Sequence, residues 1–398
     1  MRYLLRIPPI APVLLLALWL VSPTATVAQE PIVRRSLVFP IQHQHVHGSS
    51  LVALPNGDLL IAWFQGSGER NADDVRIMGA RQLKGAKEWS DPFELADTPH
   101  LPDCNPVLFM VGDRLFLVWI AVQANRWENS ILRVRTTTAY AGAEAPAWEW
   151  QDNILLKPDD GFAEEVAAKL KALPPQQAGW AEYAPRYDQL IMTASQDAAK
   201  RSTGWMTRIK PLVKPDGEIL LPLYSDGFNL SLIALSDDAG RSWLPSQPMV
   251  GRGNIQPALL LRRDGSIVAY MRDSGDAPTR LQLSESHDGG KSWTVADKTA
   301  LPSGASVDAL TLRDGRWAML FNDVDDGRYR LSLYISDDEG KTWPLRYPIE
   351  FDAGKKGRFS YPSLIQADDG LLHLSYSYHL DSDKKSISHV VVDPARLR

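Results

Sequence analysis

The chain has 398 residues, of which 44% are hydrophobic, and its formal net charge is -5. This length and hydrophobic fraction allow a large buried core, and the charge balance excludes the basic surface that nucleic-acid binding requires. A soluble globular protein without a nucleic-acid partner is the expected class.

The first 28 residues have the pattern of a secretory signal peptide. Arg2 and Arg6 precede the apolar run APVLLLALWLV, and small residues follow it in SPTATVAQE. The run is too short for a comfortable membrane span, so we predict cleavage after Ala28 and no membrane span in the mature protein. The mature chain, 29–398, is expected in a bacterial periplasm or outside the cell.

Three histidines, His43, His45 and His47, stand at alternate positions just before the apolar run SSLVALP. On a strand they share one face, because side chains alternate with period two. A zinc site is one interpretation, but it needs a fourth ligand from elsewhere. The others are a surface position for His43 and His45 and an acid or base role for His47. We predict no metal and no cofactor.

The single cysteine, Cys104, cannot form an internal disulfide. Its neighbours Asp103 and Pro106 offer nothing that lowers the pKa of the thiol, so we interpret Cys104 as a buried packing residue.

Six dipeptides typical of tight turns separate pairs of apolar runs, and each predicts a two-residue hairpin. They are Asn56-Gly57, Gly112-Asp113, Asp216-Gly217, Asp264-Gly265, Asp314-Gly315 and Asp369-Gly370. Three octapeptides, SDDAGRSW, SHDGGKSW and SDDEGKTW, end at Trp243, Trp293 and Trp343. Their Asp, Gly and Trp residues predict a second kind of turn, in which Asp binds backbone amides and Trp covers one side.

These signals predict an all-β fold. Each repeat of about fifty residues holds four short antiparallel strands, which describes one blade of a six-bladed β-propeller. The last repeat shows three clear strands, and the early strand at 32–40 is expected to supply the fourth. Residues of about 152–205 contain the helix-like GFAEEVAAKLKAL and are interpreted as an insertion between blades 2 and 3. The mature chain is a single predicted domain, and we expect a monomer.

The octapeptides match the Asp-box, S-x-D-x-G-x-x-W, and with six blades the mature chain resembles the sialidase-like superfamily of secreted glycan-active propellers. This resemblance implies a site at the blade openings. Where a sialidase opens blade 1 with an arginine, this chain has His47. The arginine and general-acid aspartate expected after the next strand correspond to Arg70 and to Asp73 or Asp74. Two further carboxylate-binding arginines correspond to Arg272 and to Arg328, with Arg330 as an alternative.

The resemblance places the nucleophilic tyrosine at Tyr361, in FSYPSLIQADDG. Gln256 stands where a glutamate should activate it, and glutamine cannot accept the proton of a phenol. Polar residues at the other blade openings complete the predicted substrate-binding set: Asp103, Asn105, Arg126, Arg208, Asp308 and Asn322. We predict no metal ligands among them.

Three functions fit these residues. The favoured one is an exo-acting glycoside hydrolase on an acidic glycan, using Asp73 or Asp74, Arg272, Arg328 and Tyr361. The second is a lyase on a uronate glycan, in which His47 or Tyr361 removes the C5 proton and the other protonates the leaving oxygen. The third is a non-catalytic glycan-binding propeller, which the aromatic residues Trp180, Tyr183 and Tyr187 of the insertion suit.

Overall fold

The computed structural model describes residues 30–174, 187–275 and 277–397. The predicted signal peptide and the insertion residues Trp180 and Tyr183 lie outside these ranges. Within them, no helix is long and apolar enough to cross a membrane.

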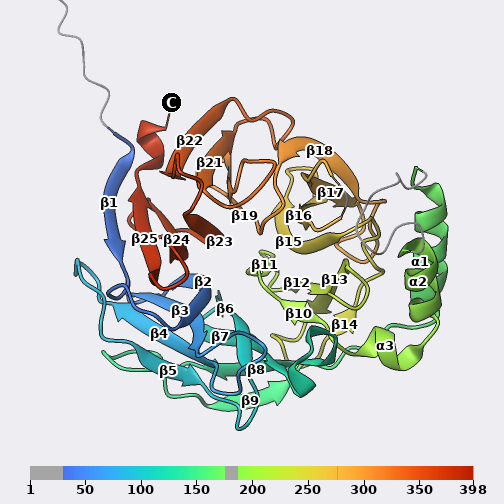
Figure 1. Cartoon of the computed structure of the whole chain (residues 1–398), viewed down its shortest axis with the longest axis horizontal. Coiled ribbons are helices and arrows are strands. Elements are labelled where there is room, and N and C mark those ends of the chain that lie inside the picture. The colour runs from blue at the N-terminus through green and yellow to red at the C-terminus, as the bar shows by residue number, and fades with distance from the viewer. Residues whose placement is uncertain (1–29, 175–186, 276, 398) are drawn as a thin grey trace, which may run out of the picture.

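Six antiparallel sheets form a ring of blades around a central axis, as predicted (Figure 1). Blade 1 consists of β2 (His45–Ala53), β3 (Leu59–Gly66), β4 (Arg76–Gln82) and β5 (Phe93–Ala96). Blade 2 consists of β6 (Asp103–Val111), β7 (Arg114–Val122), β8 (Ser130–Thr137) and β9 (Trp150–Asn153). Blade 3 consists of β10 (Met206–Thr207), β11 (Leu212–Val213), β12 (Ile219–Ser225), β13 (Leu230–Ser236) and β14 (Leu244–Pro245). In blade 3 the innermost position is shared by two short strands, β10 and β11, which both pair with β12.

Blades 4, 5 and 6 complete the ring. Blade 4 consists of β15 (Asn254–Leu261), β16 (Ile267–Asp273), β17 (Arg280–Ser286) and β18 (Asp297–Pro302). Blade 5 consists of β19 (Asp308–Thr311), β20 (Trp317–Phe321), β21 (Arg330–Ser336) and β22 (Leu345–Phe351). Blade 6 consists of β23 (Arg358–Gln366), β24 (Leu372–His379), β25 (Lys385–Val392) and β1 (Ile32–Leu37). The N-terminal strand β1 pairs with β25 and closes the ring, which confirms the predicted origin of the fourth strand. Closure leaves no long sheet edge exposed at the junction.

The second strands of the blades are nearly continuous apolar runs because both faces of each sheet are buried between neighbouring blades. In β3 and β7 the runs LLIAWF and LFLVWIAV are buried throughout. One cluster of buried apolar side chains extends through blades 1, 2 and 3. This packing fixes the blades against one another and so holds the ends of the innermost strands in register around the axis.

The hairpins between first and second strands are correctly placed, but five of the six are one residue longer than predicted. In blade 4, Arg262 N donates to Ser266 O, so the loop is Arg263–Asp264–Gly265. A two-residue loop of the expected type needs positive φ at both central residues, whereas here only Gly265 has one, at 87°. The same three-residue loop recurs in blades 1, 3, 5 and 6. Only Gly112-Asp113, between the paired residues Val111 and Arg114, is a two-residue hairpin.

Each Asp-box forms the turn between the third and fourth strands of its blade. In blade 4, Asp288 accepts hydrogen bonds from Ser286 Oγ (2.9 Å), Ser292 N (2.9 Å) and Ser292 Oγ (2.6 Å). These bonds outweigh partial burial and lower the pKa of Asp288. A Cβ at Gly290 would lie 2.8 Å from a methyl of Leu220, so the turn packs closely on blade 3. The motifs are structural and lie away from the axis.

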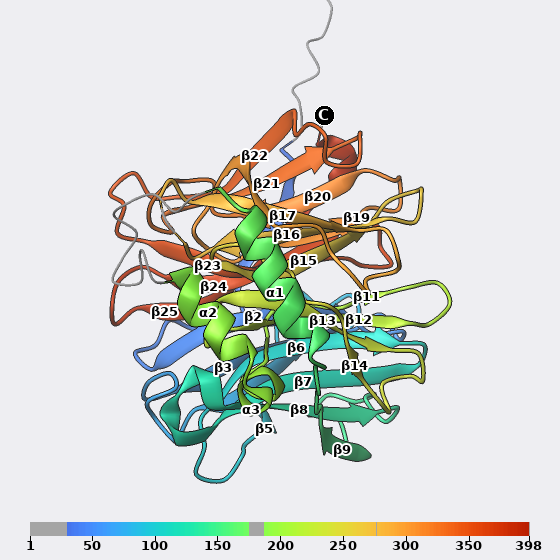
Figure 2. The same ribbon diagram turned by 90° about the vertical axis from the view of Figure 1, so that its right-hand side faces the viewer.

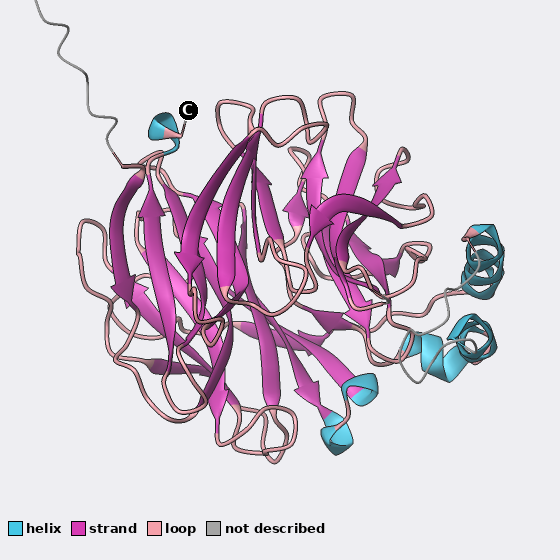
Figure 3. Cartoon of the chain, turned by 45° about the horizontal axis from the view of Figure 1, so that its top comes forward, coloured by secondary structure: helices cyan, strands magenta, loops and turns pink. Residues whose placement is uncertain are grey.

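The insertion between β9 and β10 is helical, as predicted, with α1 (Gly161–Ala172), α2 (Tyr187–Ser195) and α3 (Ala198–Ser202). The helices lie outside the ring, against blades 3 and 4 (Figures 2 and 3). Asp188 at the start of α2 forms an ion pair with Arg252 (2.8 Å), and Tyr187 donates to the carbonyls of Phe228 and Asn229. The helices therefore buttress the connection between blades 3 and 4.

Candidate active site

Four innermost strands carry a β-bulge near their first residues, and this end of the axis is called the bulge end below. The pairing register shifts between His47 and Ser50 in β2, Cys104 and Val107 in β6, Ile255 and Ala258 in β15, and Ser360 and Ser363 in β23. One residue in each bulge has a left-handed backbone: Gly48, Asn105, Gln256 and Tyr361. The left-handed conformation costs a non-glycine residue roughly 1–2 kcal/mol. Three such residues at one end of the axis are typical of a functional site.

Tyr361 is the centre of the predicted residues that the structure brings together. Its hydroxyl lies 3.4 Å from Arg272 Nη1, and the guanidinium of Arg328 lies 5.1 Å from the centroid of its ring. Arg272 is fixed by a hydrogen bond to Gly304 O (3.0 Å), and Arg328 by one to Ser360 Oγ (3.3 Å). Burial acts to raise the pKa of Tyr361, but the charges of Arg272 and Arg328 and a hydrogen bond from Gln256 bring it below its ordinary value.

Gln256 connects Tyr361 to residues of blades 2 and 3. Its side chain hydrogen bonds to both Tyr361 and Tyr224, and Asn105 Nδ2 lies 3.1 Å from the Tyr224 hydroxyl. An amide carries two N–H donors, so one glutamine serves both phenols. The Gln256 amide is a neutral hydrogen-bond donor and so favours the phenolate form of Tyr361. A glutamate at this position would accept a hydrogen bond from the hydroxyl and favour the phenol form instead.

Two carboxylates on the loops after β3 and β12 face this cationic group. Burial raises the pKa of Glu69, and the nearby carboxylate of Asp226 adds to the rise, although Arg70, Arg328 and Arg272 oppose it. Asp226 is exposed at the surface, yet the surrounding protein removes enough water from its carboxylate to raise its pKa, against the charges of Arg272 and Arg70. Neither residue is among the sequence predictions. Glu69, whose charge also acts on Tyr361, is therefore a carboxyl group suited to hold a proton.

The two aspartates predicted as general acids have other surroundings. Asp74 is exposed and accepts hydrogen bonds from Ser67 N (3.0 Å) and Ser67 Oγ (2.8 Å), which lower its pKa. A lowered pKa is unfavourable for an acid catalyst near neutral pH. Asp73 is also exposed and accepts from Asn125 Nδ2 (3.1 Å). Both aspartates order the loop on which Glu69 and Arg70 lie.

Histidines of blades 1 and 6 line the other side of Tyr361. The ring centroids of His47 and Tyr361 are 4.1 Å apart, and His47 Nδ1 lies 2.8 Å from Ser377 Oγ. The rings of His45 and His379 lie 5.8 and 5.4 Å from that of His47. Burial holds the pKa of His47 well below its usual value, so the ring is neutral at neutral pH. His43 lies before β2 and is exposed.

Several predicted substrate-binding residues make polar contacts within the fold. Asp103 accepts from Thr98 N (2.6 Å) and Trp119 Nε1 (2.9 Å) inside blade 2, and burial raises its pKa to about 6. Asp308 accepts from Lys210 Nζ (2.5 Å) and Leu364 N (2.7 Å), which joins blade 5 to blades 3 and 6. Asn322 donates to the carbonyls of Arg330 and Phe359.

The remaining two predicted residues lie in contrasting environments. The side chain of Arg126 is 70% exposed, near Glu128 on the loop after β7. Arg208 is buried, and its guanidinium lies 4.8 Å from the centroid of the Tyr361 ring. It donates to Ser49 O (3.2 Å) and Pro362 O (3.1 Å). Arg208 thus supports Tyr361 and uses both terminal nitrogens within the protein.

The bulge end thus combines a tyrosine of lowered pKa, two guanidinium groups beside its hydroxyl, and a carboxyl group of raised pKa. Such a set can bind a carboxylate, act on the carbon next to it and supply a proton. In the described ranges, no group of three or more His, Cys, Asp or Glu side chains is placed to hold a metal ion.

Comparison with known proteins agrees with this architecture. The profile of the BNR repeat-like domain matches residues 57–174 and 188–374. The chain belongs to the BNR repeat-like domain family. No curated protein is significantly similar to this chain in sequence.

Solved structures with the same fold include a protein of unknown function from Dyadobacter fermentans (TM-score 0.66, 16% identity, covering 91% of this chain and 98% of that one). The NanB sialidase of Streptococcus pneumoniae gives a TM-score of 0.64 at 11% identity, covering 93% and 71%. The intramolecular trans-sialidase of Ruminococcus gnavus gives 0.61 at 13% identity, covering 89% and 95%. At these identities the likeness establishes the sialidase-like propeller fold.

Proposed function

We propose that this protein is an exported glycoside hydrolase that removes a terminal acidic sugar at the bulge end of the propeller. The observation that carries the proposal is the placement of the Tyr361 hydroxyl 3.4 Å from Arg272 Nη1, with Arg328 over its ring. Two guanidinium groups at this position suit a carboxylate, which they bind through paired, charge-assisted hydrogen bonds. The fold likeness to sialidases supports the same substrate class.

The closeness of Tyr361 to Arg272 restricts the kind of acidic sugar. A carboxylate held by Arg272 leaves its own carbon and the next carbon within reach of the phenol. Nucleophilic attack at the anomeric carbon then requires a sugar whose carboxylate is attached to that carbon. A uronic acid carries its carboxylate on C5, across the ring oxygen from the anomeric carbon. We therefore expect hydrolysis of 2-keto sugar acids and no hydrolysis of uronides.

In this mechanism Tyr361 attacks the anomeric carbon as the phenolate, and Glu69 protonates the departing glycosidic oxygen. The products are a tyrosyl glycoside and the released alcohol. Glu69, now ionised, removes a proton from water, whose oxygen attacks the anomeric carbon and releases Tyr361. Arg272, Arg328 and the amide of Gln256 stabilise the phenolate both as nucleophile and as leaving group.

A second candidate is elimination on a uronate glycan, which the contact between His47 and Tyr361 favours. The arginines neutralise the uronate carboxylate and so acidify the C5 proton. The neutral imidazole of His47 removes that proton, and the Tyr361 hydroxyl protonates the leaving oxygen at C4. This reaction needs Tyr361 as a phenol at its start, whereas hydrolysis needs the phenolate.

Mass spectrometry of products formed in oxygen-18 water tests both candidates. Chain 29–398 is incubated with oligosaccharides ending in 2-keto sugar acids and, separately, with uronate oligosaccharides. Heavy oxygen in the released acid establishes hydrolysis, and an unlabelled unsaturated product establishes elimination. Absence of product with both panels overturns the enzymatic proposals and leaves a glycan-binding propeller, which glycan-array binding then examines.

Two tyrosine variants assign the reaction to the bulge end. Tyr361→Phe should abolish product formation in the oxygen-18 experiment. Tyr378→Phe changes a partly buried tyrosine on the adjacent strand β24 and should leave the products unchanged. Export is proposed from the N-terminal sequence alone, and N-terminal sequencing of the protein recovered from bacterial periplasm or medium tests it. A mature terminus at Gln29 is expected, and an uncleaved Met1 would contradict export through this segment.

A further inference from the structure

We propose that Arg208 is a positioning residue, which orients the Tyr361 ring and favours its phenolate form from across the propeller axis. The proposal rests on the proposed role of Tyr361 and adds a residue that makes no contact with substrate.

The first observation is the interruption of the innermost strand in blade 3. Strands β10 and β11 are separated by Arg208–Pro211, whereas each of the other blades has one innermost strand. The interruption allows the Arg208 side chain to leave its own blade. It ends between Ser49 of blade 1 and Pro362 of blade 6, to whose carbonyls it donates.

The second observation is that these contacts fix both the arginine and the tyrosine. Pro362 directly follows Tyr361, whose φ of 55° is strained for a residue with a side chain. A hydrogen bond from Arg208 Nη2 to Pro362 O (3.1 Å) holds the peptide next to that strained residue. The planar guanidinium can bond two carbonyls and face the ring at once, which a lysine ammonium cannot do in the same way.

The third observation concerns charge. The Arg208 guanidinium lies 4.8 Å from the ring centroid, and its side chain is buried. Removal from water strengthens a cation–π contact, and an ionised phenol presents a more electron-rich ring than a neutral one. Nε of Arg208 has no hydrogen-bond partner in the described part of the chain, and the two terminal nitrogens bond carbonyls. The carboxylate of Asp308, which pairs with Lys210, acts on Arg208 through its charge and not through one of these hydrogen bonds. Its charge is therefore available to stabilise the phenolate.

A bracing role alone is the competing explanation, and the chain provides a control for it. Lys210, two residues later in the same interruption, reaches blade 5 and pairs with Asp308 (2.5 Å). Lys210 also joins two blades through a cation, but it has no contact with Tyr361 among the interactions described. Replacing Lys210 should reduce stability in the way that loss of a brace does, without changing the ionisation of Tyr361.

The test is a spectrophotometric titration of Tyr361, read as phenolate absorbance of each protein minus that of its Tyr361→Phe derivative. Arg208→Gln should raise the apparent pKa of Tyr361 by about one unit, a tenfold change in its ionisation constant. Lys210→Met should lower the melting temperature and leave the Tyr361 titration as in the wild type. An Arg208→Gln protein that melts earlier but titrates like the wild type overturns the proposal and leaves Arg208 as a brace.

Arg208→Lys keeps the test decisive if Arg208→Gln does not fold. It preserves a positive charge but loses the planar bridge between the two carbonyls, so Tyr361 should keep its lowered pKa while kcat falls about tenfold and KM stays constant. A folded Arg208→Lys enzyme with wild-type kcat contradicts the positioning role. The titration needs no substrate, so a failure of the proposed hydrolase activity remains distinguishable from a failure of this inference.

Discussion

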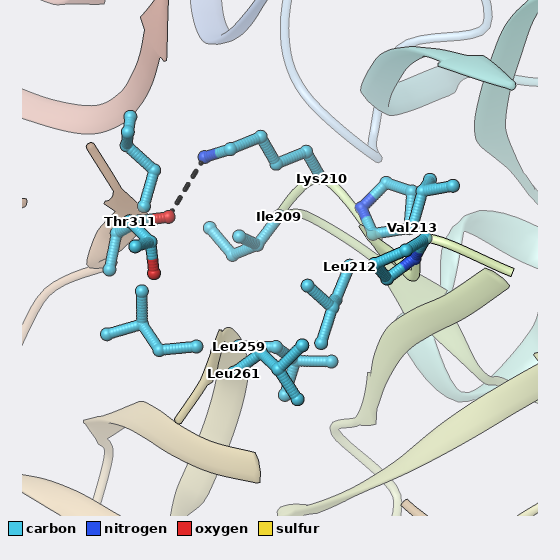
Figure 4. Close-up of a pocket in the computed structure, with 12 residues that line it drawn as sticks. Ile209, Lys210, Leu212, Val213, Leu259, Leu261 and Thr311 are labelled. Carbon is cyan, nitrogen blue, oxygen red and sulfur yellow. Dashed lines mark hydrogen bonds between the residues drawn. The ribbon is translucent and has the colours of Figure 1, made fainter. Parts of the chain in front are cut away.

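The two ends of the innermost strands differ sharply although the same strands connect them. At the bulge end, pairing is interrupted, three non-glycine residues have left-handed backbones, and charged groups surround Tyr361. At the other end, here called the turn end, the strands pass into regular hairpins whose left-handed position is a glycine. A pocket of about 340 Å³ at the turn end is lined mainly by apolar residues of β11, β15 and β19 (Figure 4).

This difference shows how one scaffold separates folding from chemistry. The turn end satisfies its backbone locally and buries apolar side chains such as Leu260 against the neighbouring blades. The bulge end retains strain and places the Oε1 of Gln256 in a buried position without a hydrogen-bond partner in the described part of the chain. Strain and unpaired polar groups persist where the surrounding structure enforces them, which is typical of catalytic sites. Substitutions at the two ends should therefore affect different measurements.

Tyr361→Phe is expected to have the largest effect. It removes the proposed nucleophile and should lower kcat by roughly 10³-fold or more, as loss of a covalent catalyst does. The backbone and ring remain and only the hydrogen bonds of the hydroxyl are lost, so the free energy of unfolding should change by no more than about 1.5 kcal/mol. Steady-state kinetics and urea denaturation measure the two quantities.

The matched control is Tyr270→Phe, whose hydroxyl lies 3.4 Å from Gly340 O in an Asp-box turn. It should lose a little stability and retain wild-type kcat. Equal kinetic loss in both variants would contradict the separation of the two ends.

Glu69→Gln is expected to lower kcat by about 10²- to 10⁴-fold on alkyl glycosides, the range for loss of a general acid. An aryl glycoside with an acidic leaving group needs no protonation, so the same variant should keep most of its activity on that substrate. Asp73→Asn should change both activities little. A loss of equal size on the two substrates would show that Glu69 does not protonate the leaving oxygen.

Glu69→Gln, which should lower kcat, is expected to increase the stability of the folded protein at neutral pH. Burial raises the folded-state pKa of Glu69 above its unfolded value. The stabilisation from protonated Glu69 is complete below the unfolded pKa and is lost as the pH rises through the folded pKa. Glu69→Gln should therefore raise the melting temperature relative to the wild type at pH 7 and not at pH 4.

The sequence predicts the turn end better than the bulge end because turn chemistry is local. Asp264 and Gly265 determine a hairpin within a few residues, and the error concerned only the loop length. The blade count, the closing strand and the helical insertion followed from such local repeats. Tyr361, Arg272 and Arg328 were predicted as site residues through resemblance, since each lies at a recognisable position within its blade.

The features of the bulge end that the sequence did not predict depend on contacts between distant parts of the chain. Glu69 was missed because its environment depends on Arg272 and Arg328, which belong to blades 4 and 5. The pKa of Asp226 is likewise set by residues of several blades, because the charges of Arg272 and Arg70 oppose its rise. Arg208 was predicted to bind substrate, and in the fold its two terminal nitrogens donate to carbonyls of blades 1 and 6. A signal was nevertheless present for Glu69, which directly precedes the predicted Arg70.

Gly265→Ala tests the turn end and should have a moderate effect. Gly265 has a φ of 87°, and a Cβ there would meet no atom within 4 Å, so only the backbone is strained. The free energy of unfolding should fall by about 1–2 kcal/mol. At Gly290 a Cβ would also collide with Leu220, so Gly290→Ala should destabilise more. Both variants should retain wild-type kcat and KM, and a kinetic change in Gly265→Ala would show that the two ends are coupled.

The smallest effect at neutral pH is expected from His389→Phe, at the closure between the last and first blades. His389 Nε2 lies 3.0 Å from His373 Nδ1, and its ring packs edge-on against Trp89 of blade 1 at 5.1 Å. Phenylalanine preserves the ring packing and loses one hydrogen bond between neutral groups, so stability at pH 7 should change by no more than about 1 kcal/mol.

The acid range should reveal His389 more clearly, because burial holds the pKa values of His389 and His373 below their ordinary values. A depressed folded-state pKa gives stability that is present above the unfolded pKa, near 6.5, and is lost as the pH falls through the folded value. Removing His389 should flatten the decline of unfolding free energy below pH 6.5 by up to about 1.4 kcal/mol per pH unit. His287→Phe, at an exposed position in an Asp-box turn, should leave that slope unchanged. An unchanged slope in His389→Phe would show that ring closure is not the acid-sensitive part of the propeller.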